Sequence, residues 1–132
     1  MSIVVAWDNP EHTVLRFVYQ GQWTWSEFHE SLTQGWSLAA DVAYPVDHIY
    51  DVTNRDTMPA GALSQMRSLR NKTPVKIGRR VLVGASMLVM AISQAMLKLN
   101  PEFNKKFLFT STLDEARRLL YSAEADTSEN PL

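Results

Sequence analysis

Side chains that could do chemistry gather in the middle of the chain. Asp56 and Thr57 lie just before Pro59, a residue that suits the first turn of a helix. A phosphate on Thr57 would meet the free backbone N–H groups and the positive end of that helix. Thr57 is therefore a candidate phosphorylation site. The alternative is an ordinary cap or loop residue, because the charge of Asp56 would repel the phosphate.

Basic residues follow the same segment and form a candidate anion-binding site. Residues 57–106 hold nine bases and one acid, whereas residues 1–56 hold two bases and eight acids, and the net charge of the whole chain is −1. The candidate anion ligands are Arg67, Arg70, Arg79 and Arg80. A solvated surface is the alternative interpretation. The overall acidity and the lack of aromatic residues between these bases argue against nucleic acid as a partner.

No arrangement of residues predicts catalysis, a metal ion or a cofactor. The three histidines, His12, His29 and His48, lack the spacing that would bring two ring nitrogens to one metal, and the chain has no cysteine. Asp51 could act as a general base at the end of a strand, but a hydrogen-bond acceptor that closes a loop is the favoured role. We expect a non-enzymatic protein, with an enzyme that uses Asp51 or Asp56 as the alternative.

The elements that must position these residues alternate between strands and helices. Strands are predicted over residues 2–7, 13–19, 46–52, 80–84 and 106–109, and helices over 25–41, 59–72, 86–99 and 112–120. Thr24 with Glu27, and Thr112 with Glu115, form capping boxes that predict where the first and last helices begin. Trp23 and Phe28 have the spacing of a hydrophobic staple around the first of these boxes.

This order predicts one α/β domain over residues 1–121, followed by a flexible acidic tail over 122–132. The first two strands should form an antiparallel hairpin, and the later strands should be parallel in a mixed five-stranded sheet. About four helices should flank the sheet. No run of residues has the length and apolarity of a membrane-spanning helix, so we expect a cytoplasmic protein that does not insert into membranes.

Three segments, together with the order of elements, resemble the anti-sigma-factor-antagonist or STAS family over most of the chain. They are Asp51-Val52-Thr53 at a strand end, Gly61-Ala62-Leu63 early in the next helix, and Thr110-Ser111-Thr112-Leu113-Asp114-Glu115-Ala116 before the last helix. In that family a phosphorylatable serine or threonine follows an aspartate, which the resemblance carries over to Asp56, Thr57 and Gly61. The chain departs from the pattern at Met58 and Pro59.

The chain is also similar to the related STAS/SEC14-like group of small bacterial proteins, which shares the fold and lacks the phosphorylation motif. We prefer this assignment. It implies binding of proteins or apolar ligands and no particular reaction. The expected function is therefore a regulatory or protein-interaction module, and the alternative is a carrier of a small apolar or amphipathic ligand.

The helix predicted over 86–99 is the best functional lead from the residues themselves. It is apolar around most of its circumference, although a helix on an open sheet normally buries one stripe. Its surplus surface should either meet a second copy in a homodimer or form the wall of a pocket for an apolar ligand. The candidate interface or pocket residues are Met87, Met90, Met96, Leu97 and Trp25.

Overall fold

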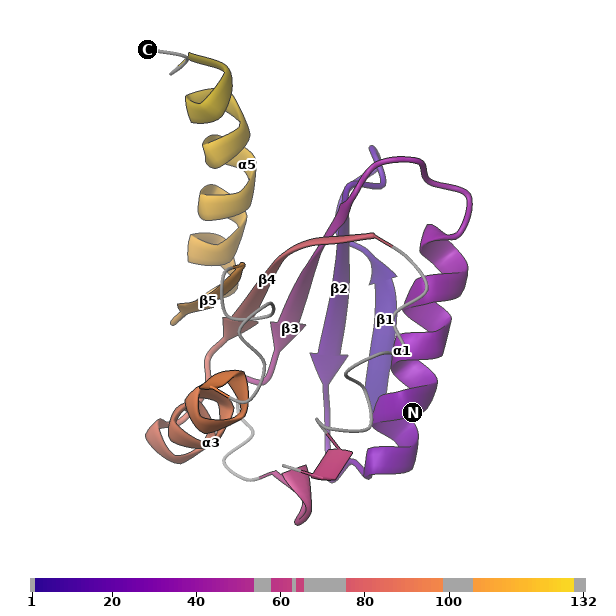
Figure 1. Cartoon of the computed structure of the whole chain (residues 1–132), viewed down its shortest axis with the longest axis vertical. Coiled ribbons are helices and arrows are strands. Elements are labelled where there is room, and N and C mark those ends of the chain that lie inside the picture. Colours follow the sequence, from indigo (N-terminus) through magenta and orange to yellow (C-terminus); the bar gives the residue numbers. More distant parts are fainter. Residues whose placement is uncertain (1, 54–57, 63, 66–75, 99–105, 130–132) are drawn as a thin grey trace.

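A computed structural model describes residues 2–53, 58–62, 64–65, 76–98 and 106–129. Its five strands are β1 (Ile3–Trp7), β2 (Val14–Tyr19), β3 (Val46–Asp51), β4 (Ile77–Val83) and β5 (Phe107–Thr110). They lie in the order β1-β2-β3-β4-β5 in one sheet (Figure 1). The β1–β2 pair is antiparallel and every other pair is parallel. The predicted α/β class, with a hairpin followed by parallel strands, is confirmed.

Three helices flank this sheet in the described part of the chain. They are α1 (Trp25–Ala39), α3 (Met87–Lys98) and α5 (Leu113–Glu129). Of the helix predicted over 59–72, a first turn is described, in which the Gln65 N–H donates to the Gly61 carbonyl at 3.0 Å. The last helix extends well past its predicted end, while the flexible tail over 122–132 stays a prediction. None of the described helices has the length and apolarity to cross a membrane.

The predicted capping box at α1 is complete, and at α5 the predicted cap residue Thr112 is in place. At α1 the Glu27 N–H donates to Thr24 Oγ1 at 3.1 Å, and the Thr24 N–H donates to Glu27 Oε1 at 3.0 Å. The ring centroids of Trp23 and Phe28 lie 6.1 Å apart across this turn, as a hydrophobic staple requires. At α5 the Thr112 hydroxyl accepts from the Glu115 N–H at 3.1 Å.

Alternation along the strands divides the core into two layers. On one sheet face, residues of β1 to β4 pack against α1 and α3, and this layer includes Ile3, Leu15, Phe17, Tyr19, Leu32, Leu82 and Val89. On the other face a smaller cluster packs against α5, and it includes Val14, Ile49, Val81, Val83, Ala116 and Leu120. Helix α5 therefore covers the face opposite to the one covered by α1 and α3.

Strand β4 begins three residues before its predicted start at Arg80, because Asp47 pairs with Arg79. The Arg79 N–H donates to Asp47 Oδ1 at 2.7 Å, and the Arg79 guanidinium lies 2.9 Å from Asp47 Oδ2. The register between β3 and β4 shifts at this point. Two consecutive arginines resemble a loop in the sequence, but here one of them is neutralised by the neighbouring strand.

A buried carboxylate holds α5 against the N-terminal hairpin. The side chain of Asp8 is 1% exposed and accepts hydrogen bonds from Arg117 Nη2 at 2.8 Å, from the Tyr121 hydroxyl at 2.5 Å, and from Arg16. Burial alone would raise the pKa of Asp8, but the hydrogen bonds from Arg117, Tyr121 and Arg16 together lower it below its ordinary value. The helix is thereby tied to the turn after β1, more than a hundred residues earlier in the chain.

We expect Gly84→Ala to destabilise the fold more than Gly21→Ala. Both glycines have positive φ, +72° and +59°, so each alanine incurs a cost of about 1–2 kcal/mol for the left-handed backbone. Only at Gly84 would the new Cβ also lie 2.3 Å from Thr53 Oγ1 and 2.9 Å from Thr53 Cα, which adds about 1–3 kcal/mol. Urea unfolding of both variants measures the difference. Equal losses would contradict the close approach of the two loops.

Candidate functional site

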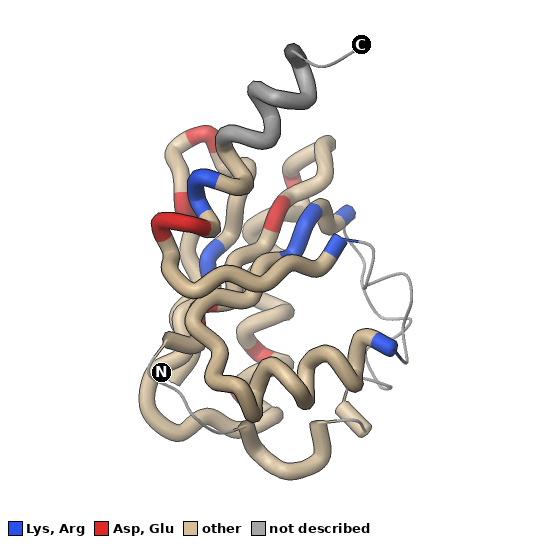
Figure 2. The backbone as a smooth tube through the Cα atoms, turned by 90° about the vertical axis from the view of Figure 1, so that its left-hand side faces the viewer, with Lys and Arg blue, Asp and Glu red and all other residues tan. Residues whose placement is uncertain are grey.

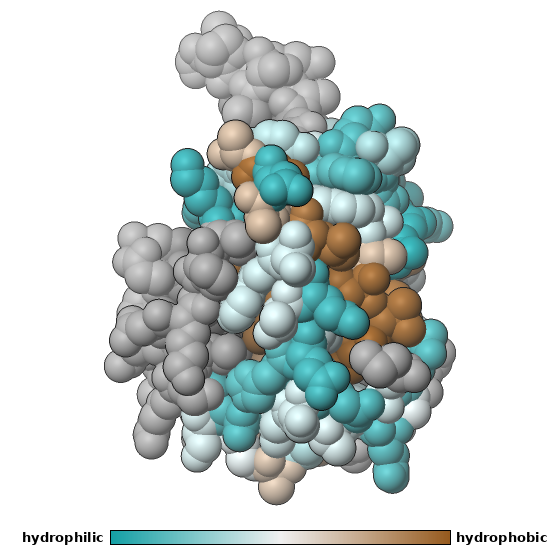
Figure 3. Space-filling view, turned by 90° about the vertical axis from the view of Figure 1, so that its right-hand side faces the viewer, coloured by the Kyte–Doolittle hydropathy of each residue, from teal (hydrophilic) through white to brown (hydrophobic). Residues whose placement is uncertain are grey.

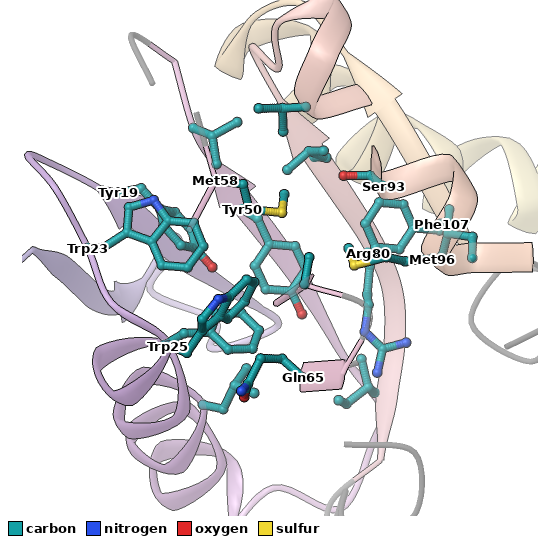
Figure 4. Close-up of a pocket in the computed structure, with 18 of the residues that line it drawn as sticks. Tyr19, Trp23, Trp25, Tyr50, Met58, Gln65, Arg80, Ser93, Met96 and Phe107 are labelled. Atoms are coloured by element: carbon teal, nitrogen blue, oxygen red, sulfur yellow. The ribbon is translucent and has the colours of Figure 1, made fainter. Parts of the chain in front are cut away.

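An apolar pocket lies between α1, the sheet and α3. Its cavity volume is about 120 Å³. Figure 4 shows Trp23 and Trp25 on the α1 side, Ser93 and Met96 on the α3 side, and Tyr50 from β3 between them. The other lining residues are Tyr19, Phe28, Leu32, Trp36, Val52, Met58, Ala62, Gln65, Ile77, Arg80, Leu82, Val89, Leu97 and Phe107. Among the described helices, α1 and α3 therefore line the pocket and α5 does not.

Aromatic rings form the wall on the α1 side and keep each other in place. Trp25 meets Trp23 and Phe28 edge to face, with ring centroids 5.0 and 5.3 Å apart. The Trp25 indole N–H donates to the carbonyl of Ala60 at 2.6 Å, which ties this wall to the segment before the second predicted helix. Phe107 stacks on Tyr50 on the sheet side, with centroids 6.4 Å apart. The space is thus bounded by flat, rigid side chains.

A short chain of hydrogen bonds lies under the pocket. The side chain of Arg80 hydrogen-bonds Tyr50, and the Tyr50 hydroxyl lies 2.9 Å from His48 Nδ1. A guanidinium can only donate, so the Tyr50 oxygen accepts from Arg80 and its own proton is donated to His48 Nδ1. The imidazole then carries its proton on Nε2, a buried atom without a partner among the described residues. His48 and Arg80 are cross-strand neighbours, which brings the three groups together.

Burial decides the protonation states of the histidine and the tyrosines beneath the pocket. His48 is completely buried, and loss of solvation, aided by the charge of Arg80, lowers its pKa to about 3. Burial raises the pKa of Tyr50, although Arg80 partly opposes this, and burial also raises the pKa of Tyr19. At neutral pH the imidazole and both phenols are therefore uncharged, and these groups add no charge to that of Arg80.

Arg80 is the one charged side chain among the described lining residues, and they include no aspartate or glutamate. Trp36 of α1 also lines the pocket, and its indole nitrogen is buried without a hydrogen-bond partner among the residues described. In Figure 2 the basic segments of β4 and of the end of α3 lie on the same side of the molecule.

The predicted anion-binding arginines are separated by the fold. Arg79 and Arg80 are adjacent in β4, so their side chains leave opposite faces of the sheet. Arg79 binds Asp47 and donates to the Leu120 carbonyl of α5 at 3.1 Å, whereas Arg80 lines the pocket. Arg67 and Arg70 lie outside the described residues, and so do Asp56 and the predicted phosphorylation site, Thr57.

The apolar helix α3 divides its surface between the pocket and solvent. Met96 and Leu97 line the pocket together with Trp25. Met90 is half-buried and lines a shallow hollow beside Phe109 and Glu115. Met87 is 90% exposed and Leu88 is 59% exposed. The predicted surplus of apolar surface is thus present, with one part against the pocket and another on the outer face of the helix.

The carboxylate considered for catalysis has a local partner. Asp51 Oδ1 accepts from the Thr53 N–H at 3.0 Å, the contact expected of a residue that closes a loop at a strand end. In the described ranges no group of three histidine, aspartate or glutamate side chains could hold a metal ion. The apolar pocket is therefore the candidate site that we consider among the described residues.

Tyr19, Tyr50, His48 and Trp36 were absent from the sequence-based candidates. Alternation could have found two of them, because His48, Tyr50 and Val52 occupy every second position of one strand and must share a face. No local pattern reveals that this face opens onto a cavity, since the cavity depends on how far α1 and α3 lie apart.

Comparisons with known proteins add no constraint on this site. No protein-family model matches the chain, and neither does any curated protein or solved structure. The function is therefore argued from the geometry of the pocket and the chemistry of its lining.

We expect the fold to lose stability as the pH falls from 7 towards 4.5, in part because of His48. Unfolded histidine binds a proton near pH 6.5, whereas the folded pKa is about 3, so the unfolded state takes up more protons between these values. The slope due to this one group approaches about 1.4 kcal/mol per pH unit below pH 6. Urea unfolding at several pH values measures it.

His48→Leu should flatten that dependence, and His12→Asn, which removes an exposed imidazole, should not. An unchanged slope in His48→Leu would contradict the buried, neutral imidazole.

Proposed function

We propose that this protein is a non-enzymatic binding module that holds a small apolar ligand in the pocket between α1, the sheet and α3. The observation that carries the proposal is a cavity of about 120 Å³ lined almost entirely by aromatic and aliphatic side chains. Ligand sites in proteins are concave, mostly apolar and equipped with a few polar groups, as this one is. The cavity is close to the volume that accepts a single aromatic ring in a protein core.

The resemblance to the STAS/SEC14-like group supports the same function, because that group implies binding and no particular reaction. The proposal places the ligand against α3, the helix whose apolarity exceeds what one sheet face needs. Of the two functions predicted from the sequence, the pocket favours the ligand carrier. A regulatory role and a cytoplasmic location remain part of the proposal.

We expect toluene to bind the purified protein and Ser93→Leu to abolish that binding. Ser93 is 4% exposed on α3 and lines the pocket, so a leucine there adds bulk inside the cavity. Ala91→Leu adds the same side chain at an exposed position of the same helix and should leave binding unchanged. Saturation-transfer NMR with toluene is the measurement. The affinity of Ser93→Leu should fall at least about tenfold, as expected when a ligand loses its cavity.

Binding that persists in Ser93→Leu would mean that toluene uses another surface, and the proposal would then be wrong. Circular dichroism of both variants shows whether the helices are intact.

A second function, self-association, is favoured by the outer face of α3. Met87 and Leu88 lie side by side and are 90% and 59% exposed. Methionine is flexible and polarisable, which suits contacts with another protein. We propose that this face meets a second copy of the chain. At the opposite end of the sheet, apolar surface also lies beside the hydrophilic outer face of α1 (Figure 3), and Val4 of β1 is 43% exposed.

We expect sedimentation of the protein to show a dimer whose population rises with concentration. The double variant Met87→Lys and Leu88→Lys should stay monomeric over the same range, because two charges would have to be buried at the interface. Gln34→Lys adds a charge at an exposed position of α1 and serves as the control. A monomer at every concentration of the unmodified chain would rule out this second function.

A further inference from the structure

The lining of the pocket contains buried hydroxyl groups that no described residue hydrogen-bonds. Resting on the binding function proposed above, we infer that the ligand is a small neutral ring compound with a carbonyl oxygen, and that the Tyr19 hydroxyl donates a hydrogen bond to this oxygen. The ring would lie between the aromatic wall on the α1 side and α3, where the proposed function places an apolar body.

The hydroxyls in question belong to Tyr19 of β2 and Ser93 of α3. Tyr19 is 6% exposed, Ser93 is 4% exposed, and both residues line the pocket. Figure 4 shows Tyr19 on the side of the tryptophans and Ser93 on the side of α3, with each hydroxyl pointing toward the space between them. Neither hydroxyl has a hydrogen-bond partner among the residues that the structure describes. A ligand with an acceptor oxygen would provide one and recover the cost of a buried, unpaired donor.

Tyr19 depends on a ligand for its partner more than Ser93 does. A serine hydroxyl in a helix can rotate toward the carbonyl of the preceding turn, as the Ser31 hydroxyl does in α1, where it donates to the Phe28 carbonyl at 2.6 Å. The Tyr19 hydroxyl is fixed at the end of a rigid ring, which meets Trp23 edge to face with centroids 5.2 Å apart. It cannot turn back to its own strand, so an acceptor has to come from the pocket.

The protonation of Tyr19 determines which kind of ligand group it binds. Burial, together with the neighbouring Tyr50, raises the pKa of Tyr19 above its ordinary value, so the phenol keeps its proton and donates it. The same surroundings disfavour a negative charge beside Tyr19, so a neutral carbonyl fits there better than a carboxylate. Tyr50 does not compete for this oxygen, because its own proton is donated to His48. In Figure 4 Arg80 lies beyond Tyr50, away from Tyr19.

Size is the remaining constraint on the ligand. The walls on the α1 side are planar rings, and a volume of about 120 Å³ suits a single ring rather than a long chain. A carbonyl oxygen attached directly to such a ring adds one atom and leaves the rest of the ligand apolar. Cyclic ketones of the size of toluene therefore have the chemistry that this pocket fits.

Cyclohexanone and methylenecyclohexane test the inference, because they differ only by an oxygen in place of a CH₂ group. Saturation-transfer NMR measures both affinities in the unmodified protein and in Tyr19→Phe, which removes the hydroxyl and keeps the ring. The ratio of the affinity for cyclohexanone to that for methylenecyclohexane should fall about three- to tenfold in Tyr19→Phe, the range expected for one hydrogen bond. The affinity for methylenecyclohexane itself should stay within about twofold.

A matched variant and a charged probe serve as controls. Tyr44→Phe also removes a phenol hydroxyl, but at an exposed position outside the pocket, and should leave the ratio unchanged. Benzamide and benzoate have nearly the same shape, and only benzoate is charged. The unmodified protein should bind benzamide more tightly than benzoate, since burial disfavours the carboxylate.

The carbonyl group of the bound ligand gives a second readout, which a merely structural role of Tyr19 would not change. Hydrogen bonding weakens the C=O bond and lowers its stretching frequency. In infrared difference spectra, cyclohexanone labelled isotopically at the carbonyl carbon should absorb at a lower frequency in the unmodified protein than in cyclohexane solution. In Tyr19→Phe the frequency should move back toward the value in cyclohexane.

The outcomes separate this inference from the function on which it rests. A ratio of affinities that Tyr19→Phe leaves unchanged would overturn the inference and leave apolar binding in place, and so would tighter binding of benzoate than of benzamide. If Tyr19→Phe does not fold, a carbonyl frequency in the unmodified protein equal to that in cyclohexane overturns the inference by itself. No binding of these compounds or of toluene would overturn the proposed function as well.

Discussion

Alternation along two neighbouring strands is the constraint on which the rest of this structure depends. In β3, and in β4 from Arg79 onward, every second side chain faces α1 and α3 and the others face α5. Asp47 and Arg79 therefore meet on the side of α5, whereas His48, Tyr50 and Arg80 meet on the side of the pocket. A slip of one residue would turn Arg79 away from Asp47 and Leu120 and move the core side chains of β4 to the opposite face. The bond of Asp47 to the backbone of Arg79 opposes such a slip.

The two faces of the sheet use polar groups in different ways. On the α5 side, Asp8 is buried but collects donors from Arg117, Tyr121 and Arg16, so its charge is matched. On the pocket side, His48 is buried in its neutral form and leaves one ring nitrogen without a partner among the described residues. The first arrangement holds elements together. The second arrangement places polar groups where apolar side chains would pack better. Such groups are more common at functional sites than in structural cores.

Local patterns in the sequence were enough to predict the sheet class and the helix starts, because each depends on residues close together in the chain. The capping box at Thr24 and the helix cap at Thr112 are examples. The start of β4 was predicted too late, because the charge of Arg79 is cancelled by Asp47, a residue thirty-two positions away. The same limit applies to the site. Met96, Leu97, Trp25 and Arg80 were named from their types, but their meeting around one cavity is a long-range property of the packing.

The cavity affects how well the side chains on the pocket side of the sheet are packed. Side chains around an unfilled apolar space lack the contacts that a closed core would give them, so this side of the sheet is less completely packed. Met58 and Met96 line the cavity and are flexible enough to fill gaps elsewhere in proteins, yet the rigid rings of Trp25, Phe28 and Phe107 hold the walls apart. A ligand that filled this space would restore these contacts, so the proposed binding would raise the free energy of unfolding.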